Sequence, residues 1–255
     1  MFNLVQTAHA AGDGISVKLA PYVLGEFLGV TITSTMVTSF VSSILLILVA
    51  YFATRKLKMV PGKLQSIFEV VVGGAYQYIE DTLESKELAR KYFPILMTIF
   101  LSLLFMNWFG LLPGVTTIGF YEAGKMTPLF YPAATDLNIA IAFAIVAMVV
   151  IEFAGIVALG VFKYGGKFIN FSSPLNFLVG IIELISEIGR LVSFSFRLFG
   201  NIFAGKTLLV VATFFVPFFL PVPILAYEVF VGFIQAGVFA FLTLIFIKLA
   251  VSEPH

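Results

Sequence analysis

Five polar side chains interrupt one of the most apolar stretches of this sequence, and their types and spacing suit proton transfer. They are Glu183, Glu187, Arg190, Arg197 and Asn201. Their offsets of 0, 4, 7, 14 and 18 residues confine them to roughly 80° of arc on a helix that turns ~100° per residue. Carboxylates exchange protons, whereas an arginine side chain, with a pKa above ~12, stays charged. The stripe therefore combines groups that titrate with a fixed cation.

A second apolar stretch carries Glu228 and Gln235, which lie seven residues apart and so share a helix face. Ionisable groups inside a membrane cost ~3 kcal/mol each on insertion scales, and they usually face a partner or a water-filled cavity. Arg197 lies 23 residues after Pro174 and 20 before Pro217, too far from either proline to snorkel to a helix end. A fixed cation favours the ionised form of a passing carboxylic acid and blocks free cations. We expect Arg197 to act in this way.

Other interpretations remain open for the neighbouring charges. Arg190 has the spacing of an ion pair with Glu187 or Glu183 that only joins helices. Alternatively, Glu183 and Glu187 lie near the cytoplasmic interface, in contact with water. Glu152 stands alone in its apolar segment, which is also typical of a neutral hydrogen-bond donor between packed helices.

The composition of the chain indicates whether water or a membrane surrounds these groups. Of 255 residues, 60% are hydrophobic and 11% are charged, with a mean hydropathy of +1.06, whereas globular chains are ~25% charged. This indicates an integral membrane protein. The sequence has no cysteine, and its two histidines, His9 and His255, lie near the termini, so we expect no metal or cofactor. A net charge of +1 argues against a nucleic-acid partner.

Uncharged runs predict the membrane segments, because a helix needs roughly 20 apolar residues to cross a bilayer. We expect an N-terminal tail at 1–30, spans at 32–53, 93–113 and 137–162, an amphipathic surface helix at 64–91, and two long segments at 175–216 and 224–250. The last two are divided by the proline-rich sequence PFFLPVP at 217–223. Whether the 64–91 helix has a partner or is a solvated connector stays open.

The 175–216 segment is too long for an upright span. It contains 42 residues without proline, which as one helix would measure ~63 Å, about twice the hydrocarbon thickness. We expect a strongly tilted or broken helix that forms a hairpin with 224–250. The predicted fold is therefore an all-α integral membrane protein, a single domain of about five membrane segments whose last two form a tilted helical hairpin.

Basic residues predict the orientation. The stretch 54–92 holds Arg55, Lys56, Lys58, Lys63, Lys86, Arg90 and Lys91. Lys163, Lys167 and Lys248 fall on the same side of the predicted spans, whereas the other side holds only Lys18 and Lys125. By the positive-inside rule, the N-terminus lies outside and the C-terminus in the cytoplasm, so the number of crossings is odd, most simply five.

Three sequences in this chain resemble one known family. They are SFRLFGNIFAGK at 195–206, followed by a segment that contains Gln235 and a chain end of SEPH, NWFGLLP at 107–113, and PAATDLN at 132–138. Together they resemble the a subunit of the F-type ATP synthase, the membrane stator of its proton-driven rotary motor. The resemblance covers essentially the whole chain beyond the N-terminal tail, and its RLFGN element is highly specific.

The resemblance implies a non-catalytic, proton-conducting subunit. By it, Arg197 faces the rotating ring of c subunits, and two offset half-channels meet near this arginine. The implied partners are the c-subunit ring, the b-subunit peripheral stalk, other ATP synthase subunits and the lipid bilayer. The implied location is an energy-transducing membrane, for which the bacterial cell inner membrane is the expected case.

The resemblance also implies individual roles. Asn201 and Gln235 match positions that flank the arginine and line the outer half-channel. Glu183 and Ser186 match polar positions of the inner half-channel, and Ser193 matches a small position one turn before Arg197.

Lys206 and Glu228 depart from the family pattern. Family members hold a carboxylate and a histidine at these two positions, in either order, whereas this chain has a lysine and a glutamate. A lysine, with an ordinary pKa of ~10.4, relays protons poorly near neutral pH unless it is strongly desolvated. We therefore expect Glu228 to be the outer proton acceptor and Lys206 its counter-charge, with direct proton transfer by Lys206 left open.

Two other classes of protein compete with this interpretation. A secondary transporter also binds solutes with intramembrane charges, but the two halves of this chain show no internal repeat. A non-conducting membrane scaffold would leave the aligned charges without a use. Gly200, Gly205, Lys206 and Thr207 have the spacing of a phosphate-binding loop, but they lie in an apolar helical context, so we expect no ATP binding by this chain.

Overall fold

The structure is a computed structural model that describes residues 21–27, 29–55, 62–112, 114–122, 125–168 and 173–252. The predicted N-terminal tail lies outside the described residues up to position 20, as do Lys56, Lys58 and the last three residues of the SEPH sequence.

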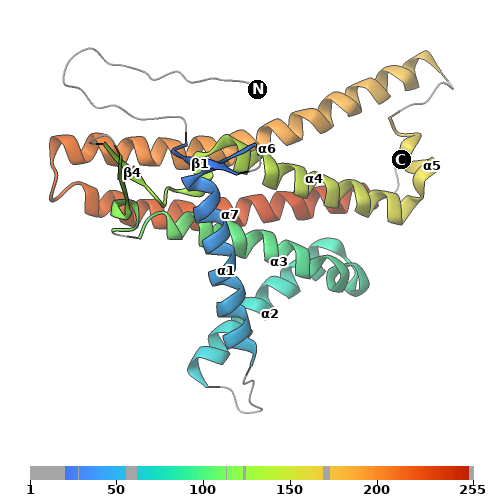
Figure 1. The fold of residues 1–255 in the computed structure, drawn as a ribbon. Coiled ribbons are helices and arrows are strands. Elements are labelled where there is room, and N and C mark those ends of the chain that lie inside the picture. Colours follow the sequence, from blue (N-terminus) through green and yellow to red (C-terminus); the bar gives the residue numbers. More distant parts are fainter. Residues whose placement is uncertain are drawn as a thin grey trace. The chain divides into compact units, whose positions relative to one another are not determined.

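Helices dominate the described chain, which confirms the predicted all-α membrane class (Figure 1). The helices are α1 (Ser34–Thr54), α2 (Lys63–Leu83), α3 (Lys86–Phe109), α4 (Leu137–Leu159), α5 (Val161–Gly165), α6 (Pro174–Phe215) and α7 (Pro221–Val251). Two short antiparallel strand pairs, absent from the sequence prediction, join β1 (Val23–Phe27) to β2 (Val30–Thr33) and β3 (Gly119–Glu122) to β4 (Lys125–Pro128). Single turns of 3₁₀ helix cover Val115–Thr117 and Ala133–Thr135.

Polar side chains set where several helices begin. The Thr33 hydroxyl accepts a hydrogen bond from the Met36 N–H at 3.3 Å, and α1 starts at Ser34, the residue after Thr33. Asp136 Oδ1 accepts from the Asn138 N–H at 2.9 Å directly before α4. These bonds satisfy backbone donors that a helix leaves without an internal partner.

The predicted 64–91 helix is divided in the structure. Glu84 adopts the left-handed conformation, with φ 55° and ψ 22°, and its N–H bonds to the Glu80 carbonyl, which ends α2. The Ser85 hydroxyl then accepts from the Leu88 N–H at 3.3 Å and begins α3. Residues 86–91 therefore belong to the helix that continues into the apolar 93–109 segment.

The segment predicted at 137–162 also ends earlier as a helix. Gly160 has a φ of 83°, a left-handed conformation that favours glycine, and it ends α4 at Leu159 before the short helix α5 begins.

Prolines mark the starts of the two longest helices. Pro174 is the first residue of α6, which has 42 residues, and Pro221 is the first of α7, which has 31. The first helical position suits proline because its missing N–H would have no partner there. Among the described residues, four helices are long and apolar enough to cross a membrane: α1, α3, α4 and α7. The tilt of α6 and α7 and the count of five crossings stay predictions.

The chain divides into two compact units. The first contains the described residues up to Ala50 together with Leu101–Ala140 and Phe196–Gly237. A polar network holds its first helix to the segment before α4: the Thr35 hydroxyl donates to Asp136 Oδ2 at 2.7 Å, and the Tyr131 N–H donates to the Thr38 hydroxyl at 3.0 Å. Thr35, Thr38 and Asp136 are buried, so these bonds form away from competing solvent and fix where Tyr131 lies.

The second unit contains Tyr51–Phe100, Ile141–Ser195 and Val238–His255. The buried Phe194 ring of α6 lies 4.7 Å from the Phe239 ring of α7, centroid to centroid. The Tyr78 ring of α2 lies 5.9 Å from that of Phe241, and Lys248 Nζ lies 2.7 Å from Glu84 Oε1. Helix α2 therefore contacts α7 through Tyr78 within this unit, and the residue that ends α2 forms an ion pair with α7.

Candidate functional site

The first unit contains a cavity of about 400 Å³ beside α6 and α7. It is lined by Asn107, Gly110, Leu111, Leu112, Gly114, Thr116, Pro132, Ile202, Gly205, Lys206, Leu209, Val210, Thr213, Leu225 and Glu228. Its walls are mainly apolar, and Lys206 and Glu228 are the titratable residues among them. The structure thus brings together two residues that the sequence placed on separate segments.

Glu228 lies deepest among the predicted site residues. It is 3% exposed, and its carboxylate packs directly against Gly205 of α6. A Cβ atom at position 205 would overlap the carboxylate, so a glycine is required for the two helices to approach with Glu228 between them. A carboxyl group held in this way has little contact with bulk water, so the residues of the cavity determine its surroundings.

Lys206 follows Gly205 on the same helix, and its ammonium contacts an aromatic ring. Lys206 Nζ lies 3.3 Å from the centroid of the Tyr131 ring, within the range of a cation–π interaction. Among the described residues, no ion pair joins Lys206 to Glu228, although both line the cavity. Sequence reasoning missed Tyr131, which directly precedes the quoted PAATDLN sequence.

Asn107 is a further cavity residue that was not predicted individually. Its Nδ2 donates to the Gly232 carbonyl at 3.1 Å, and the neighbouring Trp108 Nε1 donates to the Val229 carbonyl at 3.0 Å. Both bonds hold α3 to the part of α7 that carries Glu228. Asn107 Oδ1 is buried and has no partner in the structure, an unsatisfied acceptor on the cavity wall. The sequence signal that could have identified Asn107 as a site residue was its place in the quoted motif NWFGLLP.

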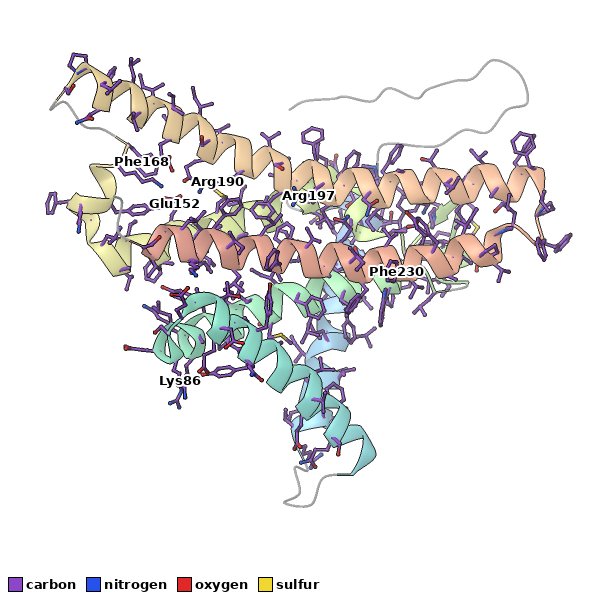
Figure 2. The ribbon with its side chains drawn as sticks, turned by 180° about the vertical axis from the view of Figure 1, so that it is seen from behind. Lys86, Glu152, Phe168, Arg190, Arg197 and Phe230 are labelled. Atoms are coloured by element: carbon purple, nitrogen blue, oxygen red, sulfur yellow. The ribbon has the colours of Figure 1, made fainter. Side chains whose placement is uncertain are left out.

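Arg197 lies on α6, where Figure 2 labels it, and the residue is exposed. Within the described part of the chain, its guanidinium has no ion pair or hydrogen bond to another residue. Asn201 and Gln235, its predicted neighbours, are half-buried and are not among the cavity-lining residues. Contact between lipid and an exposed arginine on an apolar helix is energetically unfavourable.

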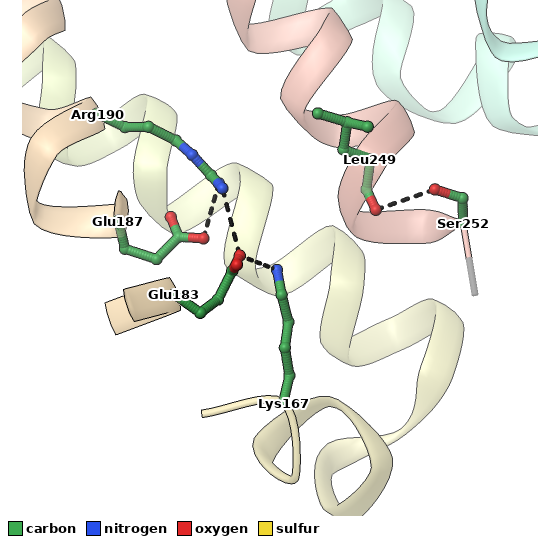
Figure 3. Close-up of polar contacts among 6 residues, drawn as sticks. All are labelled: Lys167, Glu183, Glu187, Arg190, Leu249 and Ser252. Atoms are coloured by element: carbon green, nitrogen blue, oxygen red, sulfur yellow. Dashed lines mark hydrogen bonds and ion pairs between the residues drawn. The ribbon is translucent and has the colours of Figure 1, made fainter. Parts of the chain in front are cut away.

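The second unit holds a separate cluster of charges on α6 (Figure 3). Arg190 Nη1 lies 2.7 Å from Glu187 Oε1, and Arg190 Nη2 lies 3.4 Å from Glu183 Oε1. Lys167 Nζ lies 2.5 Å from the same Glu183 oxygen. The spacing that suggested an Arg190 ion pair therefore corresponds to real contacts, and Glu183 has two cationic partners.

Further groups surround this charge cluster. The Arg190 guanidinium carbon lies 4.7 Å from the centroid of the Phe246 ring. Burial, followed by the charge of Glu152 and a hydrogen bond to it, raises the pKa of Tyr164 above its usual range. Glu152 and Glu187 each keep one buried carboxylate oxygen without a partner in the structure. These oxygens can accept a proton or a water molecule, so the cluster is suited to proton exchange as well as to joining helices.

Ser186 and Ser193 lie on the exposed surface of α6. They are seven residues apart, with the exposed Gly189 between them, and so they share one face of the helix. Small side chains at such positions allow another helix to approach closely.

A helical membrane fold, a buried carboxylate on a cavity and an exposed arginine without a partner among the described residues are together typical of membrane proteins that conduct ions. Residues 36–248 match the model of a known family, the ATP synthase A chain. The chain belongs to this family.

Individual relatives agree with the family match. The chain is 36% identical over 214 residues to ATP synthase subunit a of Campylobacter curvus, which covers 84% of this chain and 88% of the relative. It is also 36% identical over 214 residues to ATP synthase subunit a 3 of Pelobacter propionicus, with 83% and 84% covered. Subunit a of Campylobacter jejuni is 33% identical over 218 residues, with 84% and 88% covered.

Proposed function

We propose that the cavity of Lys206 and Glu228 belongs to one proton half-channel of this subunit and that the Glu183 cluster belongs to the other, with Arg197 as the fixed charge that separates the two routes. The family already establishes the wider role: the chain is a non-catalytic, proton-conducting subunit of an ATP synthase and works with the other subunits of that complex. The comparisons give no support to the secondary-transporter alternative.

Glu228 is the proton acceptor of the outer half-channel. The single observation that carries this assignment is the burial of Glu228, which is 3% exposed on the wall of a cavity of about 400 Å³. A carboxyl group in such a place can exist in either protonation state, whereas a permanently charged one would be costly there. Lys206, on the same wall, supplies a cationic counter-charge, and Asn201 and Gln235 continue the route towards Arg197.

Glu183 and Ser186 belong to the inner half-channel, and Ser193 gives the rotor room to approach. Lys167 and Arg190 lie 2.5 and 3.4 Å from Glu183 Oε1, so two cations hold its carboxylate in place. A carboxylate oxygen in this position can serve as an acceptor on the route of protons released from the rotor.

Arg197 faces the carboxylates of the c-subunit ring. Its exposure and its lack of a partner among the described residues support this assignment, because an arginine turned towards lipid would cost ~3 kcal/mol or more. A passing carboxylic acid loses its proton beside the guanidinium and is then stabilised as a carboxylate. Arginine itself does not release a proton, so it prevents a direct leak.

The remaining partners are proposed from membership of the family, and the orientation from the distribution of basic residues. We expect the b-subunit stalk to bind this chain in the membrane sector. We expect the complex to reside in the bacterial inner membrane, with five crossings, the N-terminus outside and the C-terminus in the cytoplasm.

The test is Arg197→Ala in the whole ATP synthase, reconstituted into liposomes. ATP synthesis driven by a proton gradient should fall by about a hundredfold or more, because the charge proposed to stabilise the rotor carboxylate is removed. The amount of assembled complex, measured on native gels, should stay unchanged. Lys86→Ala is the matched control, since it removes a cation whose side chain is 85% exposed at the start of α3. Synthesis by Arg197→Ala at the control rate would end the proposal.

A further inference from the structure

Tyr131 is held firmly beside the cavity residue Lys206. Its N–H donates to the buried Thr38 hydroxyl at 3.0 Å, and its ring meets the Tyr22 ring edge-on, with centroids 5.3 Å apart and planes at 66°. Tyr131 also immediately precedes Pro132, which restricts its own backbone. The face of the ring that meets Lys206 Nζ at 3.3 Å is thus fixed by contacts that do not involve the lysine.

An aromatic face and a carboxylate affect a lysine differently. The ring attracts the ammonium through its π electrons but neither removes its charge nor accepts its proton. A carboxylate would form an ion pair, which favours the charged state of both partners. In a mainly apolar cavity such a pair would be tight, since little water screens it.

Glu228 is the competing partner for the Lys206 ammonium. Its carboxylate lies against Gly205, the residue before Lys206, and both side chains line the same cavity. Lysine has a flexible four-carbon stem, so a competing contact can decide whether its ammonium pairs with this carboxylate. Among the described residues, that contact is with Tyr131.

We infer that Tyr131 is a positioning residue: its ring face holds the Lys206 ammonium so that Glu228 remains free to take up and release protons. The inference rests on the proposed role of Glu228 as outer proton acceptor. It also gives a reason for a lysine at this position, because a cation held at a distance raises the potential of the cavity without binding its carboxylate.

The phenol group suits this role because it stays neutral. Burial, followed by the charge of Tyr22, raises the pKa of Tyr131 to about 12. The ring therefore carries no negative charge near neutral pH. The charged and titratable groups near Lys206 are then Tyr131 itself, Glu228 in the same cavity, and Tyr22, whose ring meets that of Tyr131.

The experiment compares Tyr131→Phe and Tyr131→Leu in the reconstituted ATP synthase, with ATP-driven proton pumping measured across a range of pH. Phenylalanine keeps the aromatic face, so its rate should stay within about twofold of the wild type. Leucine frees the ammonium to pair with Glu228. Its rate near neutral pH should then fall about tenfold, and its pH profile should move about one unit or more towards acid. Phe130→Leu is the matched control, because that ring meets the Phe109 ring and, within the described part of the chain, no cation.

Two further comparisons separate positioning from packing. In a Lys206→Met background there is no ammonium to hold, so Tyr131→Leu should cause no further loss. If the leucine variant does not assemble, 3,4,5-trifluorophenylalanine at position 131 replaces it. That residue has nearly the shape of phenylalanine but a weaker π face, and it should reproduce the acid shift.

Equal rates and pH profiles for Tyr131→Phe and Tyr131→Leu would overturn the inference. A tenfold loss from Tyr131→Leu that persists in the Lys206→Met background would also overturn it, because the loss would then come from packing. Glu228→Gln distinguishes the two levels of the argument. Wild-type pumping by Glu228→Gln would remove the proposed role of Glu228 itself. If Glu228→Gln loses pumping while Tyr131→Leu keeps the wild-type rate and pH profile, only the role of Tyr131 is removed.

Discussion

Gly205 imposes the narrowest steric constraint at the cavity. Its missing side chain makes the space in which the Glu228 carboxylate lies. Close-packed interiors respond to the addition of even one methyl group, because neighbouring atoms have little room to move. The position of the Glu228 carboxylate, the proposed proton acceptor, therefore depends on the lack of a side chain at Gly205 of α6.

Gly205→Ala tests this constraint. The added methyl group should displace the Glu228 carboxylate, and proton-driven ATP synthesis should fall about tenfold or more, since proton transfer depends steeply on geometry. The measurement is synthesis per assembled complex in liposomes. Gly74→Ala on α2 is the control, because a Cβ atom there meets nothing within 4 Å. If both variants match the wild type, Glu228 has freedom that the structure does not show.

At the scale of elements, the charge cluster of α6 also bears on packing, besides its proposed part in proton exchange. Glu187 is 6% exposed, and Arg190 Nη1 is its cationic contact at 2.7 Å. Glu183 differs, because Lys167 lies 2.5 Å from its Oε1 and would remain after loss of the arginine. Removing one partner of a buried pair leaves an uncompensated charge, which costs more than the pair itself contributes.

Arg190→Met should therefore lower the free energy of unfolding by about 3 kcal/mol. Its effect is measured as the thermal midpoint of the detergent-purified complex. Adding Glu187→Gln to Arg190→Met should restore much of the loss, because the uncompensated charge is then gone. A double variant as unstable as the single one would show that packing of Arg190 on Phe246, at 4.7 Å, accounts for the effect instead.

At the scale of the whole molecule, one ion pair bears on membrane topology. Lys248 Nζ near the end of α7 lies 2.7 Å from Glu84 Oε1 in the turn between α2 and α3, and the hydrogen bond from Lys248 lowers the pKa of Glu84. Groups in such contact lie on the same side of a membrane. The positive-inside rule independently assigned both regions to the cytoplasm.

The absence of cysteine makes this topology directly testable. Single cysteines placed by Lys86→Cys and Ile118→Cys lie at exposed positions, 85% for the Lys86 side chain and 52% for Ile118. A membrane-impermeant maleimide should label the first only from the cytoplasmic face and the second only from the outer face. Detergent-solubilised samples, in which both should react, provide the control. Labelling of both from one face would contradict the proposed orientation.

The sequence by itself determined the solvent and the helical class. An apolar chain must satisfy its backbone hydrogen bonds internally within a bilayer, and helices do so locally. Local sequence also accounts for where three of the described helices begin, since Thr33, Asp136 and Pro174 act on their own first turns. Glu84 was harder to foresee, because a left-handed non-glycine residue carries no strong local signal.

Only the tertiary structure decided which polar residues share a site. Lys206 and Glu228 were expected to pair, yet the ammonium meets Tyr131, a residue 75 positions earlier in the chain. Such contacts depend on how helices and loops distant in sequence pack, and helical periodicity specifies only the face of one element. The sequence therefore determined the chemical groups available for proton transfer, and the packing around Gly205 and Tyr131 decided how they can be used.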